Sequence, residues 1–354
     1  MSLGERLRAA RAAAGLSLRQ LAEMTPVSHT AVANYEKDGD VPSSPVLIAL
    51  ADATGVDMGF LFRSSDVRLG EPLWRKRKGL TKTEQASILA KTQDVLERYF
   101  EVEDLLGLEP LALHIDLIPS AVQSLDDAER VAEELRGAWQ LGLGPIEDLA
   151  ELLENRGIRV VYLPASETFD GLTVRANDSV PVIVLNSDFF PGDRRRLSLA
   201  HELAHIVMDI REGVDVEQAA NRFAGAFLFP AQMVVSELGI RRNDLSIYEL
   251  HLLKHKWGVS MQGIIHRAEQ AGVISPSRAN SMRMGFRKNH WTKTEPGDQY
   301  VDQRSRRLER LVMQALAEGA ISRTKASELL GMSFDDFRQN VVSEHGADLV
   351  GTCN

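Results

Sequence analysis

The stretch Leu197-Ser-Leu-Ala-His-Glu-Leu-Ala-His-Ile-Val-Met-Asp-Ile210 places two histidines and a glutamate in the order His-Glu-x-x-His within an apolar run. The apolar residues predict a buried helix, on which residues four apart lie one above the other. His201 and His205 can therefore reach one metal ion, and Glu202 points about 100° to the side of His201. The pattern is typical of sites where Zn²⁺ activates a water molecule and the glutamate takes its proton. We predict a zinc site on this helix; the alternative is a core helix with two hydrogen-bonded histidines.

The composition is that of an ordinary globular protein of 354 residues, long enough for two or three domains, with 44% hydrophobic residues. No apolar run approaches the roughly 20 residues that cross a bilayer, and the first residues carry no secretory signal. We therefore expect a cytoplasmic protein with no membrane partner. The single cysteine, Cys353, excludes an intrachain disulfide and a thiolate zinc cluster, so histidine, aspartate or glutamate must hold any metal. The net charge of −9 argues weakly against a nucleic-acid partner, although the charge is unevenly spread.

Residues 1–66 have the pattern of short helices separated by turn signals. The expected helices run from Leu3 to Ala14, from Ser17 to Met24 and from Ser28 to Lys37, and two more reach Phe62. Ser17 and Ser28 are good N-caps. The second and third helices, joined through Thr25-Pro-Val, have the spacing of a helix-turn-helix, in which the helix from Ser28 would enter the major groove of DNA.

The same segment has a characteristic set of residues: Leu7, Arg8, Arg11, Gly15-Leu-Ser17, Leu21-Ala22, Val27-Ser28, Tyr35-Glu36, Pro42-Ser43, Leu47, Leu50-Ala51 and Gly55-Val56. With these residues it resembles the Cro and phage-repressor (XRE) family of helix-turn-helix proteins. The resemblance implies that double-stranded DNA is a partner. It also implies that four side chains face base edges and two lie near phosphates: Ser28, His29, Thr30 and Asn34 in the first group, Arg19 and Lys37 in the second.

The charges of residues 1–66 give this DNA-binding hypothesis less support, because six basic side chains stand against eight acidic ones. The contribution of phosphate contacts to affinity should therefore be modest. We also consider that the protein forms a homodimer. The alternative to DNA binding is that these five helices form a module that serves only dimerisation or partner docking.

Residues 67–148 are expected to form a basic linker and connecting helices. The most basic stretch of the chain, Trp74-Arg-Lys-Arg-Lys78, could extend along the DNA backbone or could be a solvated charge run in a linker. A long helical pattern begins at Thr81, and further helices are expected at Leu125–Trp139 and Ile146–Arg156.

Strand composition precedes the His-Glu-x-x-His helix, at Ile158–Leu163, Leu172–Arg175 and Val180–Leu185. A small sheet followed by the metal helix is similar to the order in zincin peptidases, where an edge strand beside the cleft can accept the substrate backbone by strand addition. After the metal helix comes a second apolar helix, Val216–Pro230.

Together, His201-Glu-Leu-Ala-His205 and the helix Val216–Pro230 resemble the ImmA/IrrE family of zinc peptidases. The resemblance covers residues 149–296, with further matching residues at Leu250–Ala268 and Glu295-Pro296. It implies that the second helix supplies the remaining zinc ligand. It also implies a regulator that cleaves a repressor, and the fusion of such a peptidase to a helix-turn-helix module is a recurrent pairing.

Three carboxylates after His205 compete for the place of the third zinc ligand: Glu212, Asp215 and Glu217. Glu217 begins a helix on whose face Asn221, Ala224 and Leu228 follow, so its carboxylate should share the side that packs on the metal helix. Glu217 also aligns with the ligand position of the resembled family. Glu212 and Asp215 lie in a connection that contains Gly213 and should hold a ligand poorly. We predict Glu217 as the ligand.

Residues 297–354 are expected to be a helical C-terminal region, with helices at Arg304–Glu318, Ser322–Leu330 and Ser333–Gln339. The last two have the spacing of a helix-turn-helix, but the same pattern also fits a helical bundle that binds a partner. His251 and His255 form a second pair spaced by four, for which packing on the peptidase is the better explanation than a metal.

The predicted fold is mainly α with a small β-sheet (α+β): a five-helix helix-turn-helix domain, a zincin-like peptidase domain and helical C-terminal residues. The leading functional hypothesis is a DNA-binding transcriptional regulator whose zinc endopeptidase cuts a repressor or antitoxin-like protein. The first alternative is a regulator or antitoxin whose peptidase fold is a sensor or partner-binding module without turnover. A metallohydrolase of small molecules is less favoured. The intact Glu202 favours catalysis, because an inactive site would be free to lose it.

Overall fold

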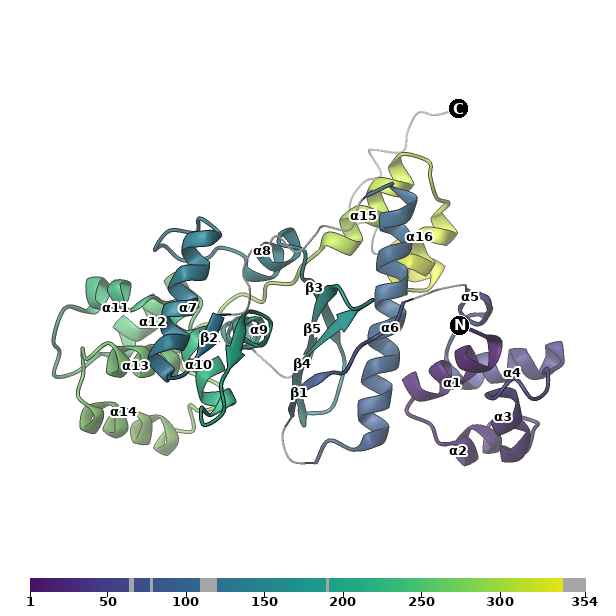
Figure 1. Ribbon diagram of the computed structural model, residues 1–354, viewed down its shortest axis with the longest axis horizontal. Helices are drawn as coiled ribbons and strands as arrows, with labels where there is room; N and C mark the ends of the chain where they lie inside the picture. Colours follow the sequence, from purple (N-terminus) through teal and green to yellow (C-terminus); the bar gives the residue numbers. More distant parts are fainter. Residues whose placement is uncertain (64–66, 77–78, 109–119, 189–190, 340–354) are drawn as a thin grey trace.

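The computed structural model describes residues 1–63, 67–76, 79–108, 120–188 and 191–339. These residues form 17 helices, a four-stranded mixed sheet and a two-stranded sheet, which confirms the mainly α, α+β prediction (Figure 1). The single cysteine, Cys353, and the last two residues of the basic stretch, Arg77 and Lys78, lie outside the described residues. None of the described helices is both long and apolar enough to cross a membrane.

The N-terminal domain contains the five predicted helices: α1 (Leu3–Ala13), α2 (Leu18–Glu23), α3 (His29–Tyr35), α4 (Ser44–Thr54) and α5 (Met58–Phe62). The hydroxyls of the N-caps Ser17 and Ser28 accept hydrogen bonds from the backbone N–H groups of Gln20 and Ala31. A separate apolar core that includes Leu21, Val32 and Leu50 holds these helices together.

The main sheet has the strand order β1-β4-β5-β3, with β1 at Leu73–Lys76, β3 at Arg159–Leu163, β4 at Phe169–Ala176 and β5 at Val180–Asn186. Strands β3, β4 and β5 were predicted, whereas for Trp74–Lys78 a contact along the DNA backbone or a solvated linker was expected. The start of this stretch is an edge strand that pairs antiparallel with β4. The physical reason is that Trp74 packs edge-on against Phe169, with ring centroids 6.2 Å apart, which gives this basic segment an apolar anchor.

The sheet is covered on both faces, and the side chains of β5 alternate accordingly. Val182 and Val184 join a core with Ile88 and Leu96 of the long helix α6 (Lys82–Leu105). Ile183 and Leu185 join the largest core, on the opposite face, with the metal-motif helix α9 (Gly192–Val207). Figure 1 shows the sheet lying between α6 and α9.

Further helices enclose α9 in that core. They are α7 (Leu125–Ala138), α8 (Leu149–Asn155), α10 (Val216–Leu228), α11 (Ala231–Leu238), α12 (Ile247–Trp257), α13 (Met261–Gln270) and α14 (Pro276–Lys288). A short parallel pair, β2 (Ser120–Val122) with β6 (Met208–Ile210), was not predicted. It continues the chain directly from the end of α9, where Met208 is already extended.

The C-terminal helices are α15 (Arg307–Ala317), α16 (Arg323–Leu330) and α17 (Phe334–Phe337). Their apolar residues, including Val312 and Phe337, share a core with Tyr99 and Val102 of α6. Helix α17, the second helix of the expected helix-turn-helix, thus packs against this core, and its first turn carries Asp335 and Asp336. This favours the helical-bundle interpretation, because carboxylates at that position would repel a phosphate backbone.

Helix α6 joins the N-terminal domain, the sheet and the C-terminal helices. A buried ion pair joins Arg6 of α1 to Glu97 of α6, and the hydroxyl of Ser87 donates to the carbonyl of Ala13 at 2.8 Å. Arg63 contacts both Asp94 of α6 and Glu328 of α16, each at 3.0 Å. Because β1 pairs with β4, the sheet also crosses the expected boundary at residue 149. The domain boundaries themselves stay a prediction.

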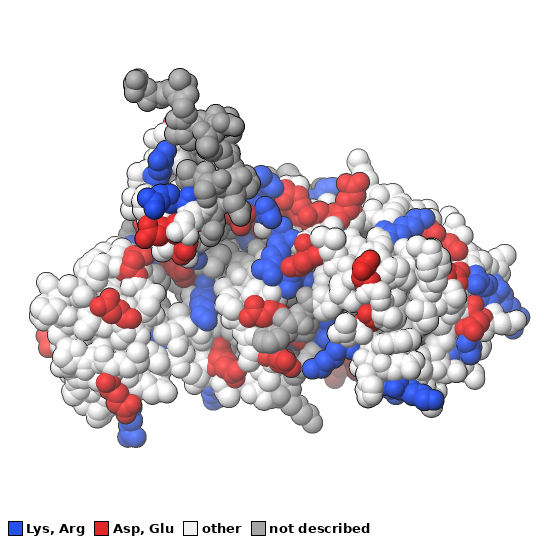
Figure 2. Space-filling view, turned by 180° about the vertical axis from the view of Figure 1, so that it is seen from behind, with Lys and Arg blue, Asp and Glu red and all other residues white. Residues whose placement is uncertain are grey.

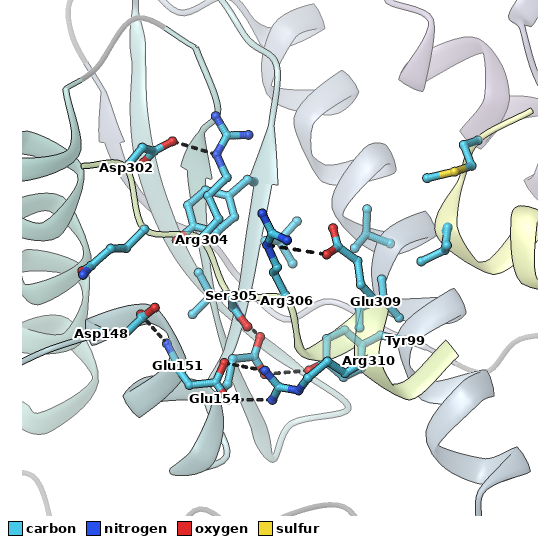
Figure 3. Close-up of a pocket in the computed structure, with 18 residues that line it drawn as sticks. Tyr99, Asp148, Glu151, Glu154, Asp302, Arg304, Ser305, Arg306, Glu309 and Arg310 are labelled. Atoms are coloured by element: carbon cyan, nitrogen blue, oxygen red, sulfur yellow. Dashed lines mark hydrogen bonds and ion pairs between the residues drawn. The ribbon is translucent and has the colours of Figure 1, made fainter. Parts of the chain in front are cut away.

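A cavity of about 950 Å³ lies where the C-terminal segment meets β3, α6 and α8 (Figure 3). Its charged side chains are largely matched with one another, such as Arg310 with Glu151 at 2.6 Å and Arg304 with Asp302 at 2.9 Å. Its most buried acid is Glu154, which accepts hydrogen bonds from the Tyr99 hydroxyl at 2.7 Å and the Val160 N–H at 2.9 Å. Burial raises the pKa of Glu154 to about 7, against the opposing charges of Arg159 and Arg307 and these hydrogen bonds.

This raised pKa predicts a pH dependence of stability. The folded protein holds the proton of Glu154 more tightly than the unfolded chain, so the free energy of unfolding should fall as pH rises from about 4.5 to about 7. The contribution is on the order of 3 kcal/mol. Glu154→Gln, which is neutral throughout, should lose less stability over that range than the wild type in urea unfolding at pH 5 and pH 8. Glu151→Gln, one turn earlier on α8, is the matched control. An unchanged pH dependence in Glu154→Gln would contradict the prediction.

Candidate metal centre

Helix α9 presents its motif to the sheet and to α10. It packs on β4 and β5 and lies along α10, so that His201 and Glu202 have no exposed surface. His205, one turn later, is half-buried. The apolar residues between them, including Leu203 and Ala204, lie in the core and fix the helix in this orientation.

Three possible ligands converge between α9 and α10. Nε2 of His201 lies 3.2 Å from Nε2 of His205 and 3.4 Å from Oε2 of Glu217. In tetrahedral zinc sites, bonds of about 2.0–2.1 Å separate the donor atoms by about 3.4 Å, so this spacing fits Zn²⁺. The three groups could hold a metal ion, and across the described ranges no other trio of His, Cys, Asp or Glu meets the same distance limit of 4.8 Å. His251 and His255 are not part of such a group.

The competing carboxylates are placed differently from Glu217. Asp215 is the N-cap of α10, and its Oδ1 accepts a hydrogen bond from the backbone N–H of Gln218 at 2.9 Å. Glu212 lies exposed in the turn before it. The side chain of Glu217 is 57% exposed, so the site opens to solvent on its side.

A residue that the sequence hypothesis did not single out orients His201. Oδ1 of Asn221, one turn after Glu217 on α10, lies 3.0 Å from Nδ1 of His201. A carbonyl oxygen there accepts the Nδ1 proton, which leaves Nε2 as the lone-pair donor for a metal. The spacing of four residues between Glu217 and Asn221 was the only sequence signal for this role.

Glu202 points toward the sheet. Its Oε2 accepts a hydrogen bond from the Thr173 hydroxyl at 2.8 Å, whereas its Oε1 is buried without a hydrogen-bond partner among the described residues. A methyl group added to Gly171 would lie 3.2 Å from this Oε1 and 2.8 Å from Cδ2 of Leu185, so glycine at residue 171 lets the carboxylate pack closely on the strand. An unsatisfied buried carboxylate oxygen is costly unless a water or ligand donates to it, which fits a general base in a metal site.

The electrostatics of the site favour metal-binding forms of its residues. Burial lowers the pKa of His205 to about 4, and the neighbouring His201 adds to the effect, so the ring is neutral near pH 7. The contact with His201 lowers the pKa of Glu217, which keeps that carboxylate ionised. Burial raises the pKa of Glu202 to about 7, although the Thr173 hydroxyl and the charge of Arg75 oppose the rise.

Arg75 has a different place from the one expected. The sequence left open whether its basic stretch extends along the DNA backbone or is a solvated charge run in a linker, but Arg75 stands on β1, and its Nη1 lies 3.3 Å from Oγ of Ser198 on α9. No local signal reveals this contact, because the two residues are 123 positions apart.

The residues predicted to meet DNA lie on the surface of the N-terminal domain. All six are exposed, at the start of α2, along α3 and just beyond it: Arg19, Ser28, His29, Thr30, Asn34 and Lys37. Three of the domain's other basic residues are engaged in ion pairs within the chain, namely Arg6, Arg11 and Arg63. Figure 2, in which this domain is the left-hand lobe, shows few basic side chains on the visible face.

The fold and the site define a helix-turn-helix protein that also carries a metallopeptidase-type domain. Residues 2–59 match the family model of a helix-turn-helix domain, and residues 153–269 match that of the IrrE N-terminal-like domain, which is a peptidase family. The chain is therefore a fusion of a helix-turn-helix domain with an IrrE-like domain. No curated protein matches the chain.

The contact between Asn221 and His201 predicts a role in metal affinity. Asn221→Ala should weaken Zn²⁺ binding by about 10- to 100-fold, because the imidazole loses the partner that fixes its tautomer and orientation. Competition with a chromophoric chelator measures the affinity. Gln218→Ala, on the same helix but in contact with Asp215, is the control and should bind Zn²⁺ like the wild type. Equal affinities for Asn221→Ala and Gln218→Ala would contradict this role.

Proposed function

We propose that this protein is a DNA-binding regulator whose zinc peptidase site hydrolyses a peptide bond in another protein. The observation that carries the proposal is the spacing of His201, His205 and Glu217 at zinc-ligand distances, next to a buried glutamate with a free oxygen. His201, His205 and Glu217 would hold the ion. When bound, Zn²⁺ lowers the pKa of a coordinated water and polarises a carbonyl group.

Glu202 would act as the general base. Thr173 holds one of its oxygens at 2.8 Å, which leaves Oε1 to take the proton of the attacking water and deliver it to the leaving nitrogen. The closed environment of Glu202 strengthens such an interaction, because no bulk water competes for the carboxylate.

The substrate backbone would add to the edge of the sheet beside α9. The sheet has the strand order β1-β4-β5-β3, and β1 is the edge strand that contacts α9 near Glu202. It presents half of its backbone N–H and C=O groups away from β4. Strand addition of this kind needs an extended segment, which a linker or a partly unfolded region of a protein supplies. We propose a repressor or antitoxin-like protein as substrate, since the peptidase is fused to a transcription-type module.

Glu202→Gln should keep Zn²⁺ and lose cleavage by several orders of magnitude, because an amide cannot accept the water's proton. The measurement is fragment formation when the zinc-loaded protein is incubated with repressors encoded near it. Metal content supplies the companion test: Glu217→Ala should lose most of its zinc, whereas Glu212→Ala and Asp215→Ala should keep it. A Glu202→Gln protein that cuts at the native rate, or zinc loss only in the other two variants, would refute the assignment. Zinc binding without cleavage of any protein would favour the sensor or partner-binding alternative.

DNA binding would use residues at the start and along the length of α3 for base contacts. Only three exposed basic residues of the domain stand outside the ion pairs described above, Arg8, Arg19 and Lys37. If each neutralises one phosphate, the logarithm of the binding constant should fall with the logarithm of salt concentration at a slope of about −3 per protomer. A homodimer would double the slope. The dimer and the cytoplasmic location stay predictions.

His29→Ala and Asn34→Ala should blunt sequence preference more than total affinity, because base contacts specify and phosphate contacts position. Lys37→Met should weaken binding to all duplexes and make the salt slope shallower by about one. Fluorescence anisotropy with a selected duplex and a random duplex at several salt concentrations measures both. Arg241→Met, an exposed arginine outside this domain, is the control. Equal affinity of the wild type for selected and random duplexes would favour the docking-module alternative.

A further inference from the structure

Arg75 projects toward the candidate metal centre from the edge of the sheet. In the antiparallel register, Arg75 lies opposite Gly171 and Leu73 lies opposite Thr173, and opposed residues project to the same face. That face carries the Thr173 hydroxyl, which donates to Oε2 of Glu202, and Gly171, which Oε1 of Glu202 approaches closely. The Arg75 side chain therefore leaves the sheet next to the free oxygen of the proposed general base.

The guanidinium of Arg75 is anchored but not neutralised. Its Nη1 donates to Oγ of Ser198 at 3.3 Å, and Ser198 lies one turn before Glu202 on α9. Within the described parts of the chain, Arg75 forms no ion pair, so most of its five N–H donors remain for a ligand.

We propose that Arg75 is a further catalytic residue of this site, whose guanidinium donates hydrogen bonds to the scissile carbonyl oxygen of the substrate. The inference rests on the proposed peptidase function. As the water oxygen bonds to the carbonyl carbon, the π electrons of the C=O bond move to that oxygen, and Glu202 takes the proton released by the water. Arg75 stabilises the negative oxygen. When the C=O bond re-forms, the C–N bond breaks and the nitrogen receives the proton from Glu202.

The position of Arg75 suits this role for two physical reasons. A donor held on a strand and by Ser198 is already oriented, so little reorganisation accompanies the rise of charge on the oxygen. A guanidinium is also permanently charged in proteins and presents its N–H donors in one plane. A substrate strand on the free edge of β1 would pass the same side chain.

The competing explanation is that Arg75 only ties β1 to α9 through Ser198. Ser198→Ala separates the two, because it removes the hydrogen bond at 3.3 Å and leaves the guanidinium. A tie predicts that Ser198→Ala and Arg75→Met have equal effects. A catalytic role predicts that Ser198→Ala has the smaller effect and that Arg75→Lys, which keeps the charge, recovers part of the loss.

The experiment loads the full chain with Co²⁺, whose visible spectrum reports ligands that reach the metal, and titrates it with inorganic phosphate and with imidazole. Phosphate is a tetrahedral anion like the charged reaction centre, whereas imidazole is a neutral metal ligand. We expect Arg75→Met to weaken phosphate binding by about 10- to 100-fold and imidazole binding by less than about threefold. Arg175→Met is the matched control, since this exposed arginine of β4 lies on the same face of the sheet further from Gly171.

The outcomes of this titration distinguish the proposed peptidase function from the role of Arg75. A wild-type protein that takes up no metal refutes the proposed function, and the role of Arg75 falls with it. A metal-loaded wild type that does not bind phosphate, or binds it as tightly as Arg75→Met does, refutes the role of Arg75 and leaves the peptidase proposal standing. Equal losses in Ser198→Ala and Arg75→Met also overturn the catalytic role.

Discussion

Both faces of the four-stranded sheet have to be covered, and the two helices that cover them organise the rest of the molecule. On one face α9 brings Glu202 against β4, where Thr173 and Gly171 surround the carboxylate. On the other face α6 buries Ile88 and Leu96. The same helix extends past the sheet and contacts the N-terminal domain and the C-terminal bundle. The candidate metal centre and the packing of the N-terminal domain and the C-terminal helices therefore both depend on this sheet.

The candidate metal centre is built from two helices that pack side by side. Helix α9 supplies the two histidines, and α10 supplies Glu217 as well as Asn221, which holds the His201 ring. The half of the cluster nearer the sheet is closed to solvent, and the half formed by Glu217 is open. A closed carboxylate beside an open ligand side suits the reaction that we propose, which needs a protected proton transfer and access for a protein substrate.

The edge strand β1 links the two functional halves of the protein. It follows the N-terminal domain in the chain, pairs with β4 of the IrrE-like domain, and carries Arg75 to α9. The N-terminal domain is itself fixed to α6 by the buried Arg6–Glu97 pair. Separating the N-terminal domain from α6 would break this buried ion pair. The cost of leaving a buried charge without its partner therefore favours the docked arrangement of the domain.

The sequence by itself determined the elements whose signals are local. The His-Glu-x-x-His spacing, the capping serines of α2 and α3 and the apolar face of α10 all act over a few residues, and the corresponding helices are present. Tertiary structure decided what touches those elements. The pairing of β1 with β4, the hydroxyl of Thr173 on Glu202 and the reach of Arg75 to Ser198 join segments from 29 to 123 positions apart. Contacts over such separations depend on how the whole chain packs, so no short pattern of residues encodes them.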